Sequence, residues 1–119
     1  MIRSVRGAVK IEQNNPDSIR ESVTTLMRRV LEENRIEKET VINIVFSQTE
    51  DLTALNPASA LRSDGYDAVP LFCTQEPKYE GSMPRVIRVL VTFETDTNIP
   101  AVPVYLNGAE TLRSDLFDS

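Results

Sequence analysis

The stretch that decides the fold is residues 86–93, an apolar strand that contains one arginine: Val86-Ile87-Arg88-Val89-Leu90-Val91-Thr92-Phe93. Because side chains alternate along a strand, Arg88 shares a face with Val86 and Leu90. A guanidinium keeps its charge, so Arg88 must meet an anion, reach water along its stem or bear a large desolvation cost. The stretch alone therefore predicts either an edge strand with a solvated or ion-paired arginine, or an anion site.

The composition of the whole chain is that of a compact globular protein. Its 119 residues are 40% hydrophobic and 26% charged, which predicts a single domain over residues 1–119 with its own core. The formal net charge of −5 argues against a nucleic-acid or anionic-membrane partner, since both need a basic surface. A small anionic ligand remains open, because a few converging arginines can reverse the local potential.

Two residue types restrict the chemistry. Histidine is absent from the sequence, and Cys73 is the single cysteine. Imidazole catalysis, histidine metal sites and an intrachain disulfide are therefore excluded, and we expect no metal and no cofactor. No apolar run approaches the ~20 residues of a membrane helix, and the first residues lack the apolar region of a signal peptide. These features predict a cytoplasmic protein.

Strand and helix signals alternate along the chain. A strand is expected over residues 2–11 with a break at Arg6 and Gly7, since glycine in a strand often marks a bulge or a close approach. Asn15 and Pro16 predict the start of a long helix over residues 16–34. The remaining elements are strands at 41–47, 68–73, 86–93 and 104–106 and a short helix at 56–62. The pattern predicts an α+β (mixed α/β) fold whose helices cover one face of the sheet, so the other face is expected to meet another subunit.

The polar residues outside this pattern have ordinary explanations when each is taken alone. Arg6 fits a solvated strand face, and Arg62 lies in the last turn of the short helix, where the helix dipole favours a cation. Cys73 fits a small buried side chain, and Glu76 fits a loop carboxylate. The carboxylates of residues 94–98 lack the spacing of a calcium loop.

Seven segments in order nevertheless resemble one family across nearly the whole chain. They are residues 2–8 (IRSVRGA), 47–52 (SQTEDL), 56–62 (NPASALR), 69–76 (VPLFCTQE), 87–89 (IRV), 104–106 (VYL) and 112–116 (LRSDL). Their combination resembles the monofunctional chorismate mutases of the Bacillus type. The resemblance implies a mixed sheet with a long and a short helix on one face, assembled as a pseudo-α/β-barrel homotrimer with active sites between neighbouring subunits.

The resemblance also implies an activity, the Claisen rearrangement of chorismate to prephenate in phenylalanine and tyrosine biosynthesis. A C–O bond breaks while a C–C bond forms within one molecule, so the reaction needs no nucleophile, base, metal or other cofactor. The protein holds the substrate in a chair-like geometry and stabilises negative charge on the ether oxygen. By resemblance, Arg88 carries that second task, and Cys73 and Glu76 engage the ring hydroxyl.

Five further residues match substrate-binding positions of the family. The resemblance implies that Arg6 and Tyr105 hold the enolpyruvyl carboxylate and that Arg62 meets the ring carboxylate. Leu112 and Arg113 match a C-terminal tail that closes over the substrate. That tail, residues 112–119 here, is expected to be mobile.

Three positions depart from the family pattern. Asn56 stands where better-known members have an aromatic residue, Ser59 stands where they have a lysine, and Phe72 replaces a small polar residue. The changes at Asn56 and Ser59 reduce the apolar and cationic contacts expected at the pocket wall, and Phe72 is expected to change the shape of that wall. Two alternatives therefore stay open: a trimeric imine or enamine deaminase-like enzyme, and a non-catalytic trimeric sensor that binds an aromatic or carboxylate metabolite.

Overall fold

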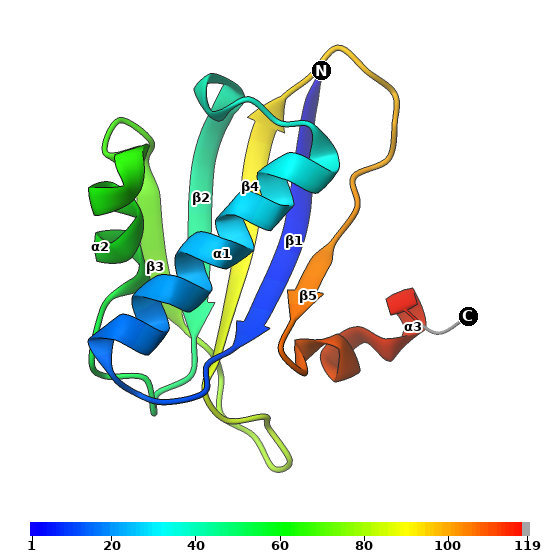
Figure 1. Ribbon diagram of the computed structural model, residues 1–119. Helices are drawn as coiled ribbons and strands as arrows, with labels where there is room; N and C mark the ends of the chain where they lie inside the picture. The colour runs from blue at the N-terminus through cyan, green and yellow to red at the C-terminus, as the bar shows by residue number, and fades with distance from the viewer. Residues whose placement is uncertain (118–119) are drawn as a thin grey trace.

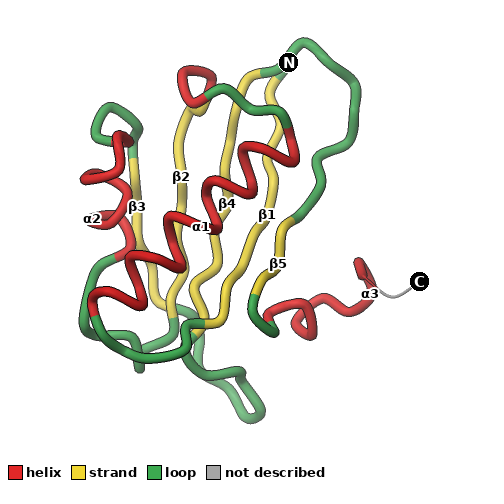
Figure 2. Tube along the Cα trace, in the orientation of Figure 1, coloured by secondary structure: helices red, strands yellow, loops and turns green. Residues whose placement is uncertain are grey.

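A computed structural model describes residues 1–117. Five strands form one mixed sheet in the order β3-β2-β4-β1-β5, as Figure 1 and Figure 2 show. The strands are β1 (Ile2–Lys10), β2 (Val41–Gln48), β3 (Leu71–Gln75), β4 (Val86–Glu94) and β5 (Val104–Leu106). The helices are α1 (Pro16–Asn34), α2 (Pro57–Leu61) and α3 (Ser114–Phe117), with the shorter helical turns η1 (Lys38–Thr40), η2 (Arg62–Tyr66) and η3 (Ala109–Arg113). Within residues 1–117, no helix is long and apolar enough to cross a membrane.

β4, the strand that contains Arg88, lies in the middle of the sheet. It pairs antiparallel with β1 on one side and with β2 on the other. β5 joins the far side of β1 in parallel, and β3 joins the far side of β2 in parallel. The mixed α+β sheet is therefore confirmed. The alternative of an edge strand is wrong for β4, because neighbouring strands take up both of its backbone edges.

α1 begins and ends at the predicted residues. The Asn15 side-chain oxygen accepts a hydrogen bond from the Ser18 N–H at 2.7 Å, and Pro16 occupies the first turn, where an N–H would have no partner within the helix. The apolar side chains that face the sheet are Ile19, Val23, Leu26, Met27 and Val30. All are at most 1% exposed, so this stripe of α1 forms one side of the core.

β1 differs from its prediction. The strand is continuous through Arg6 and Gly7, so the expected break is wrong. Gly7 instead marks a close approach, since a Cβ there would lie 3.0 Å from Val89 Cγ1 and 3.1 Å from the Val104 carbonyl oxygen. Glycine leaves room for β5 and the core to pack against this position while the strand stays regular.

The bounds of β3 are also shifted from those predicted. The strand spans Leu71–Gln75 instead of residues 68–73. The Pro70 carbonyl accepts from the Ile44 N–H at 3.0 Å, but proline has no N–H to donate, so the strand begins after it. At the other end Gln75 pairs with Gln48 of β2, which extends the strand into a polar segment. Pro70 does precede an edge strand, as predicted.

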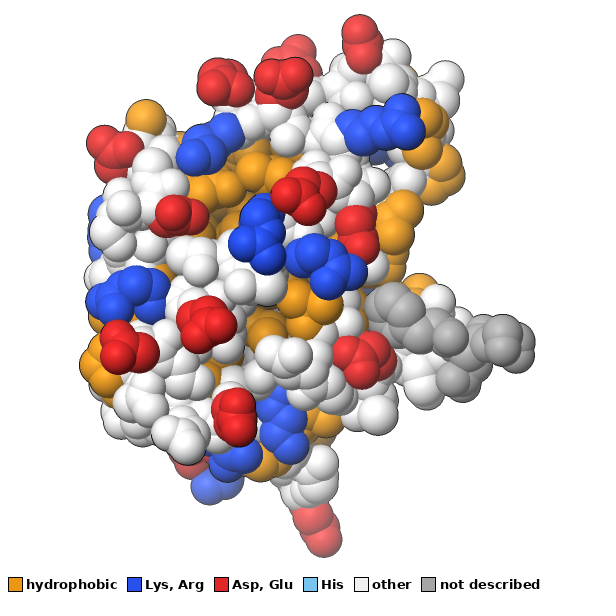
Figure 3. Space-filling model, viewed as in Figure 1, with side chains coloured by type: hydrophobic (Ala, Val, Ile, Leu, Met, Phe, Trp, Pro, Cys, Tyr) orange, Lys and Arg blue, Asp and Glu red, His pale blue; other side chains and the backbone are white. Residues whose placement is uncertain are grey.

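α1 and α2 lie on the same face of the sheet, as predicted (Figure 1). Basic and acidic side chains are mixed over this helical face (Figure 3). On the opposite face, strand pairing aligns Phe72, Val45 and Leu90 in one apolar row. Phe72 is 65% exposed and Leu90 is 40% exposed. An apolar row on an open sheet face is typical of a surface that contacts another protein.

The end of the described chain covers part of that open face. Tyr105 and Ala109 form a small apolar cluster with the fully buried Ala8, and Leu112 packs against this cluster. The residues of the expected mobile tail form the end of η3 and α3. Residues 118 and 119 lie outside the described residues, and the mobility of the tail stays a prediction.

Candidate active site

Arg88 lies on the face of β4 that the helices leave open, aligned with Ser47 of β2 and Ala8 of β1. Its Nε is 2.9 Å from Glu76 Oε1, with the two side chains 32% and 16% exposed. A carboxylate therefore balances the guanidinium in a partly buried ion pair. The Nε–H is not aimed directly at that oxygen, so among residues 1–117 this contact is an ion pair and not a hydrogen bond. Because the pair is made through Nε, the terminal nitrogens of the guanidinium are the donors that can meet an anionic or polar ligand.

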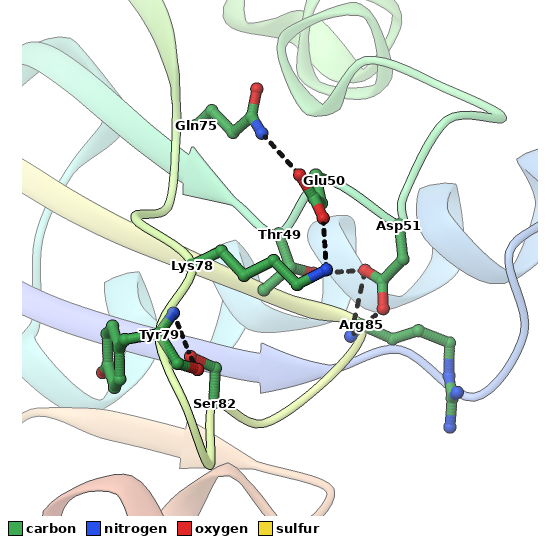
Figure 4. A network of polar contacts seen from close by, with 8 residues as sticks. All are labelled: Thr49, Glu50, Asp51, Gln75, Lys78, Tyr79, Ser82 and Arg85. Atoms are coloured by element: carbon green, nitrogen blue, oxygen red, sulfur yellow. Dashed lines mark hydrogen bonds and ion pairs between the residues drawn. The ribbon is translucent and has the colours of Figure 1, made fainter.

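The loop between β3 and β4 fixes the position of Glu76. Glu76 directly follows β3, and its N–H donates to the Gln48 carbonyl oxygen of β2 at 2.7 Å. Figure 4 shows the polar contacts that hold the loop: Lys78 Nζ lies 2.8 Å from Glu50 Oε1. At the end of the loop, the Asp51 carboxylate accepts from the Arg85 N–H at 3.1 and 3.2 Å. Both ends of the loop are thus tied to the segment that follows β2, which sets Glu76 against Arg88.

A small hollow opens beside the Arg88–Glu76 pair. Both residues line it, together with Met83, Val86 and Leu112. Leu112 comes from η3, so the loop, β4 and the C-terminal segment meet at one point. Apolar walls reduce the screening of the Arg88 charge by water, which strengthens its field inside the hollow.

The C-terminal segment brings one further cation, Arg113, close to Arg6 of β1. Arg113 donates to Asp115 from Nε at 3.0 Å and from Nη2 at 2.9 Å. These hydrogen bonds from Arg113, with a smaller contribution from the charge of Arg6, hold the pKa of the Asp115 carboxyl below its usual value. Tyr105, 6% exposed, is close enough to influence Arg113 electrostatically. Arg6, Tyr105 and Arg113, all predicted to bind substrate, therefore lie in one neighbourhood.

The other predicted residues lie at the opposite edge of the sheet. Cys73 of β3 contacts the main core and donates its S–H to Asn56 Oδ1 at 3.2 Å. Arg62 follows α2 and is exposed, with a hydrogen bond of 3.3 Å to a serine of that helix. β3 and β5 are the two edges of the sheet, four strand spacings of about 4.8 Å apart, or roughly 19 Å. One chain therefore does not bring Arg62 and Cys73 together with Tyr105 and Arg113.

Two residues contact the predicted site residues but were not themselves predicted as site residues from the sequence. Asp115 pairs with Arg113 two residues earlier, a spacing that could have suggested the contact. Asn56 is expected only as a departure from the family pattern. Its place before Pro57 does signal a helix cap, and its Oδ1 accepts from the Ala58 N–H at 2.8 Å. The bond to Cys73 spans 17 residues and has no local signal.

The fold and the site together define a class of protein: a small α+β domain whose open sheet face has arginines beside a partly buried carboxylate. Within residues 1–117, no group of three or more Cys, Asp or Glu side chains is arranged to hold a metal ion.

The chain belongs to the chorismate mutase type I family, whose sequence model matches residues 2–116. It is 42% identical over 118 residues to the chorismate mutase AroH of Thermus thermophilus, across 98% of this chain and 97% of that protein. It is 36% identical to the chorismate mutase AroH of Bacillus subtilis, across 98% and 93%. A solved chorismate mutase from Clostridium thermocellum superimposes with a TM-score of 0.87 at 34% identity, over 92% of this chain and 98% of that one. The predicted family and enzyme class, an isomerase, are confirmed.

Proposed function

We propose that this chain rearranges chorismate to prephenate at the Arg88–Glu76 pair. The observation that carries the proposal is the Arg88 guanidinium, which lies on an inner strand and is paired with the Glu76 carboxylate through Nε, so that its terminal nitrogens can meet a second partner. A fixed positive charge of this kind suits a reaction in which negative charge grows on an oxygen. Membership of the chorismate mutase type I family supports the identity of that reaction.

The reaction breaks one bond and forms another within a single molecule. As the ether C–O bond lengthens, electron density moves onto the oxygen, and Arg88 stabilises it with its N–H donors. Glu76 keeps the guanidinium in place beside the ring hydroxyl. Leu112, which lines the hollow, helps to hold the enolpyruvyl arm over the ring, so the substrate is restricted to its reactive geometry.

The two carboxylates of chorismate need separate partners. Arg6 and Tyr105 receive the enolpyruvyl carboxylate, and Arg113 closes over it from the C-terminal segment. Arg62 receives the ring carboxylate and Cys73 contacts the ring hydroxyl, both from the opposite edge of the sheet. These converging arginines attract a dianion even though the chain has a net charge of −5.

We infer that the chain forms a homotrimer in which neighbouring subunits share each active site. The substrate-binding residues are divided between two edges of the sheet, so a complete site needs one edge from each of two chains. The apolar row of Phe72, Val45 and Leu90 on the open face supports this assembly, because it offers a surface to bury between subunits. The cytoplasmic location stays a prediction.

The direct test is to incubate the purified protein with chorismate and to follow the loss of its ultraviolet absorbance. We expect turnover to prephenate, identified as phenylpyruvate after acid treatment, and light scattering should give three times the chain mass of 13.4 kDa. Release of ammonia from an imine or enamine would support the deaminase alternative. Binding of chorismate without turnover would support the sensor. Either result would overturn the proposed function.

A further inference from the structure

Asn56 makes two hydrogen bonds with one oxygen. Its Oδ1 accepts from the Ala58 N–H at 2.8 Å, which caps α2, and from the Cys73 S–H at 3.2 Å. The backbone donor identifies this atom as the oxygen of the amide, because the amide nitrogen could not accept. The contact to the thiol is therefore fixed in its direction, with sulfur as the donor.

This contact restricts what Cys73 can do for a ligand. A thiol has a single hydrogen and weak acceptor capacity on sulfur. Once the hydrogen is given to Asn56, the sulfur can only accept from a ligand. The bond also fixes the rotation of the side chain, which lies on an edge strand between the core and solvent.

We propose that Asn56 is a positioning residue that turns Cys73 into a hydrogen-bond acceptor for the ring hydroxyl of the substrate. This inference rests on the proposed function, because it takes Cys73 to contact that hydroxyl. Asn56 thus acts on the substrate through the Cys73 sulfur. It occupies the position at which better-known members of the family have an aromatic residue. The specificity that follows is for a ring substituent that donates a hydrogen bond.

Capping of α2 is the competing explanation for Asn56, and one substitution separates the two roles. In Asn56→Ser the hydroxyl stays close enough to the backbone to cap Ala58, but the shorter side chain no longer reaches Cys73. In Asn56→Ala both bonds are lost. The difference between the melting temperatures of the two variants reports on the cap, and the kinetic change that both variants share reports on the thiol.

The first measurement is the S–H stretching band in the Raman spectrum, which belongs to Cys73 alone because the chain has one cysteine. We expect a hydrogen-bonded band in the wild type that moves to higher frequency in both Asn56 variants. The second measurement is the kinetics with chorismate. Both variants should raise KM by about fivefold, which is the change in affinity expected for the loss of one hydrogen bond. The value of kcat should stay within about twofold of the wild type.

A double-mutant cycle completes the test. In a Cys73→Ala background, Asn56→Ser should have no further effect on kcat/KM, because the group through which it acts is gone. An unshifted S–H band, an equal effect of Asn56→Ser in both backgrounds, or wild-type kinetics in Asn56→Ser would overturn the inference. A wild type that does not turn over chorismate would instead refute the proposed function, and the band would still report whether Asn56 holds the thiol.

Discussion

The ion pair between Arg88 and Glu76 joins them through Nε, at 2.9 Å, and a guanidinium can present its terminal nitrogens to a second partner at the same time. An ammonium group has no such planar arrangement of donors. We therefore expect Arg88→Lys to lower kcat/KM for chorismate by about a hundredfold or more, the usual effect of losing a donor to a developing oxyanion. Initial rates of chorismate loss measure the effect.

The control for this substitution is Arg28 on α1. This arginine is exposed, and its Nε lies 4.0 Å from Glu32 Oε1. Arg28→Lys should leave the rate unchanged, since a surface pair of this kind contributes little. Circular dichroism shows whether both variants are folded. Near-normal turnover by a folded Arg88→Lys variant would contradict the role assigned to Arg88.

Tyr66 makes the stability of the fold depend on pH in the alkaline range. Tyr66 is 3% exposed, and burial, with a smaller effect of the Asp64 charge, raises the pKa of its hydroxyl from 10.0 to about 12. The folded chain thus favours the neutral phenol. Between these two pKa values the unfolded chain binds fewer protons than the folded one, so the free energy of unfolding should fall as the pH rises through the window.

Tyr66→Phe tests this dependence. The substitution keeps the aromatic ring, over which Lys38 Nζ lies at 4.4 Å, and removes only the ionisable hydroxyl. We expect a shallower fall in the free energy of unfolding above pH 10, measured by urea denaturation across the alkaline range. Tyr79→Phe is the control, because Tyr79 is 62% exposed. Equal slopes in the wild type and in Tyr66→Phe would contradict the prediction.

At the scale of elements, the start of α1 depends on Asn15. Its side-chain oxygen accepts a hydrogen bond from the Ser18 N–H at 2.7 Å. We expect Asn15→Ala to lower the free energy of unfolding by about 1 kcal/mol, while Asn15→Asp, which can still accept, stays close to the wild type. Urea denaturation measures both. A loss of similar size in Asn15→Asp would mean that the cap is not the cause.

Local signals explain why α1 could be predicted to the residue and β3 could not. The cap at Asn15, the proline after it and the apolar stripe all lie within the helix they define. The bounds of β3 depend instead on its pairing with β2, which brings Gln75 beside Gln48. Likewise the room left by Gly7 is set by Val89 and β5, far away in the sequence, so a break and a close approach could not be told apart.

The same limit applies to the site. The resemblance named the residues, but nothing local shows that Glu76 reaches Arg88 or that Asn56 holds the Cys73 thiol. Those contacts depend on how β2, β3 and β4 pair and on where the loop after β3 returns. The ion pair expected as one alternative for Arg88 is present, and it lies on an inner strand where the edge-strand explanation fails.

At the scale of the whole molecule, the residues proposed to bind substrate are divided between two sides of the sheet. The β3 edge holds Arg62 and Cys73, and the other half holds Arg88 with the residues of β5 and the C-terminal segment. In the proposed homotrimer, two such edges from different subunits of a closed ring complete each site. Loss of Arg62 and loss of Arg88 therefore damage opposite sides of every shared site.

Mixing two inactive variants tests this arrangement. Arg62→Ala and Arg88→Ala homotrimers each have a defect in all their sites, so each should be nearly inactive with chorismate. If the two are unfolded together in equal amounts and refolded, random trimers place two intact edges together at about a quarter of the sites, and we expect about that fraction of wild-type activity. Each variant refolded alone is the control. If one chain formed a whole site by itself, no mixing would restore activity, because every site would keep its own defect.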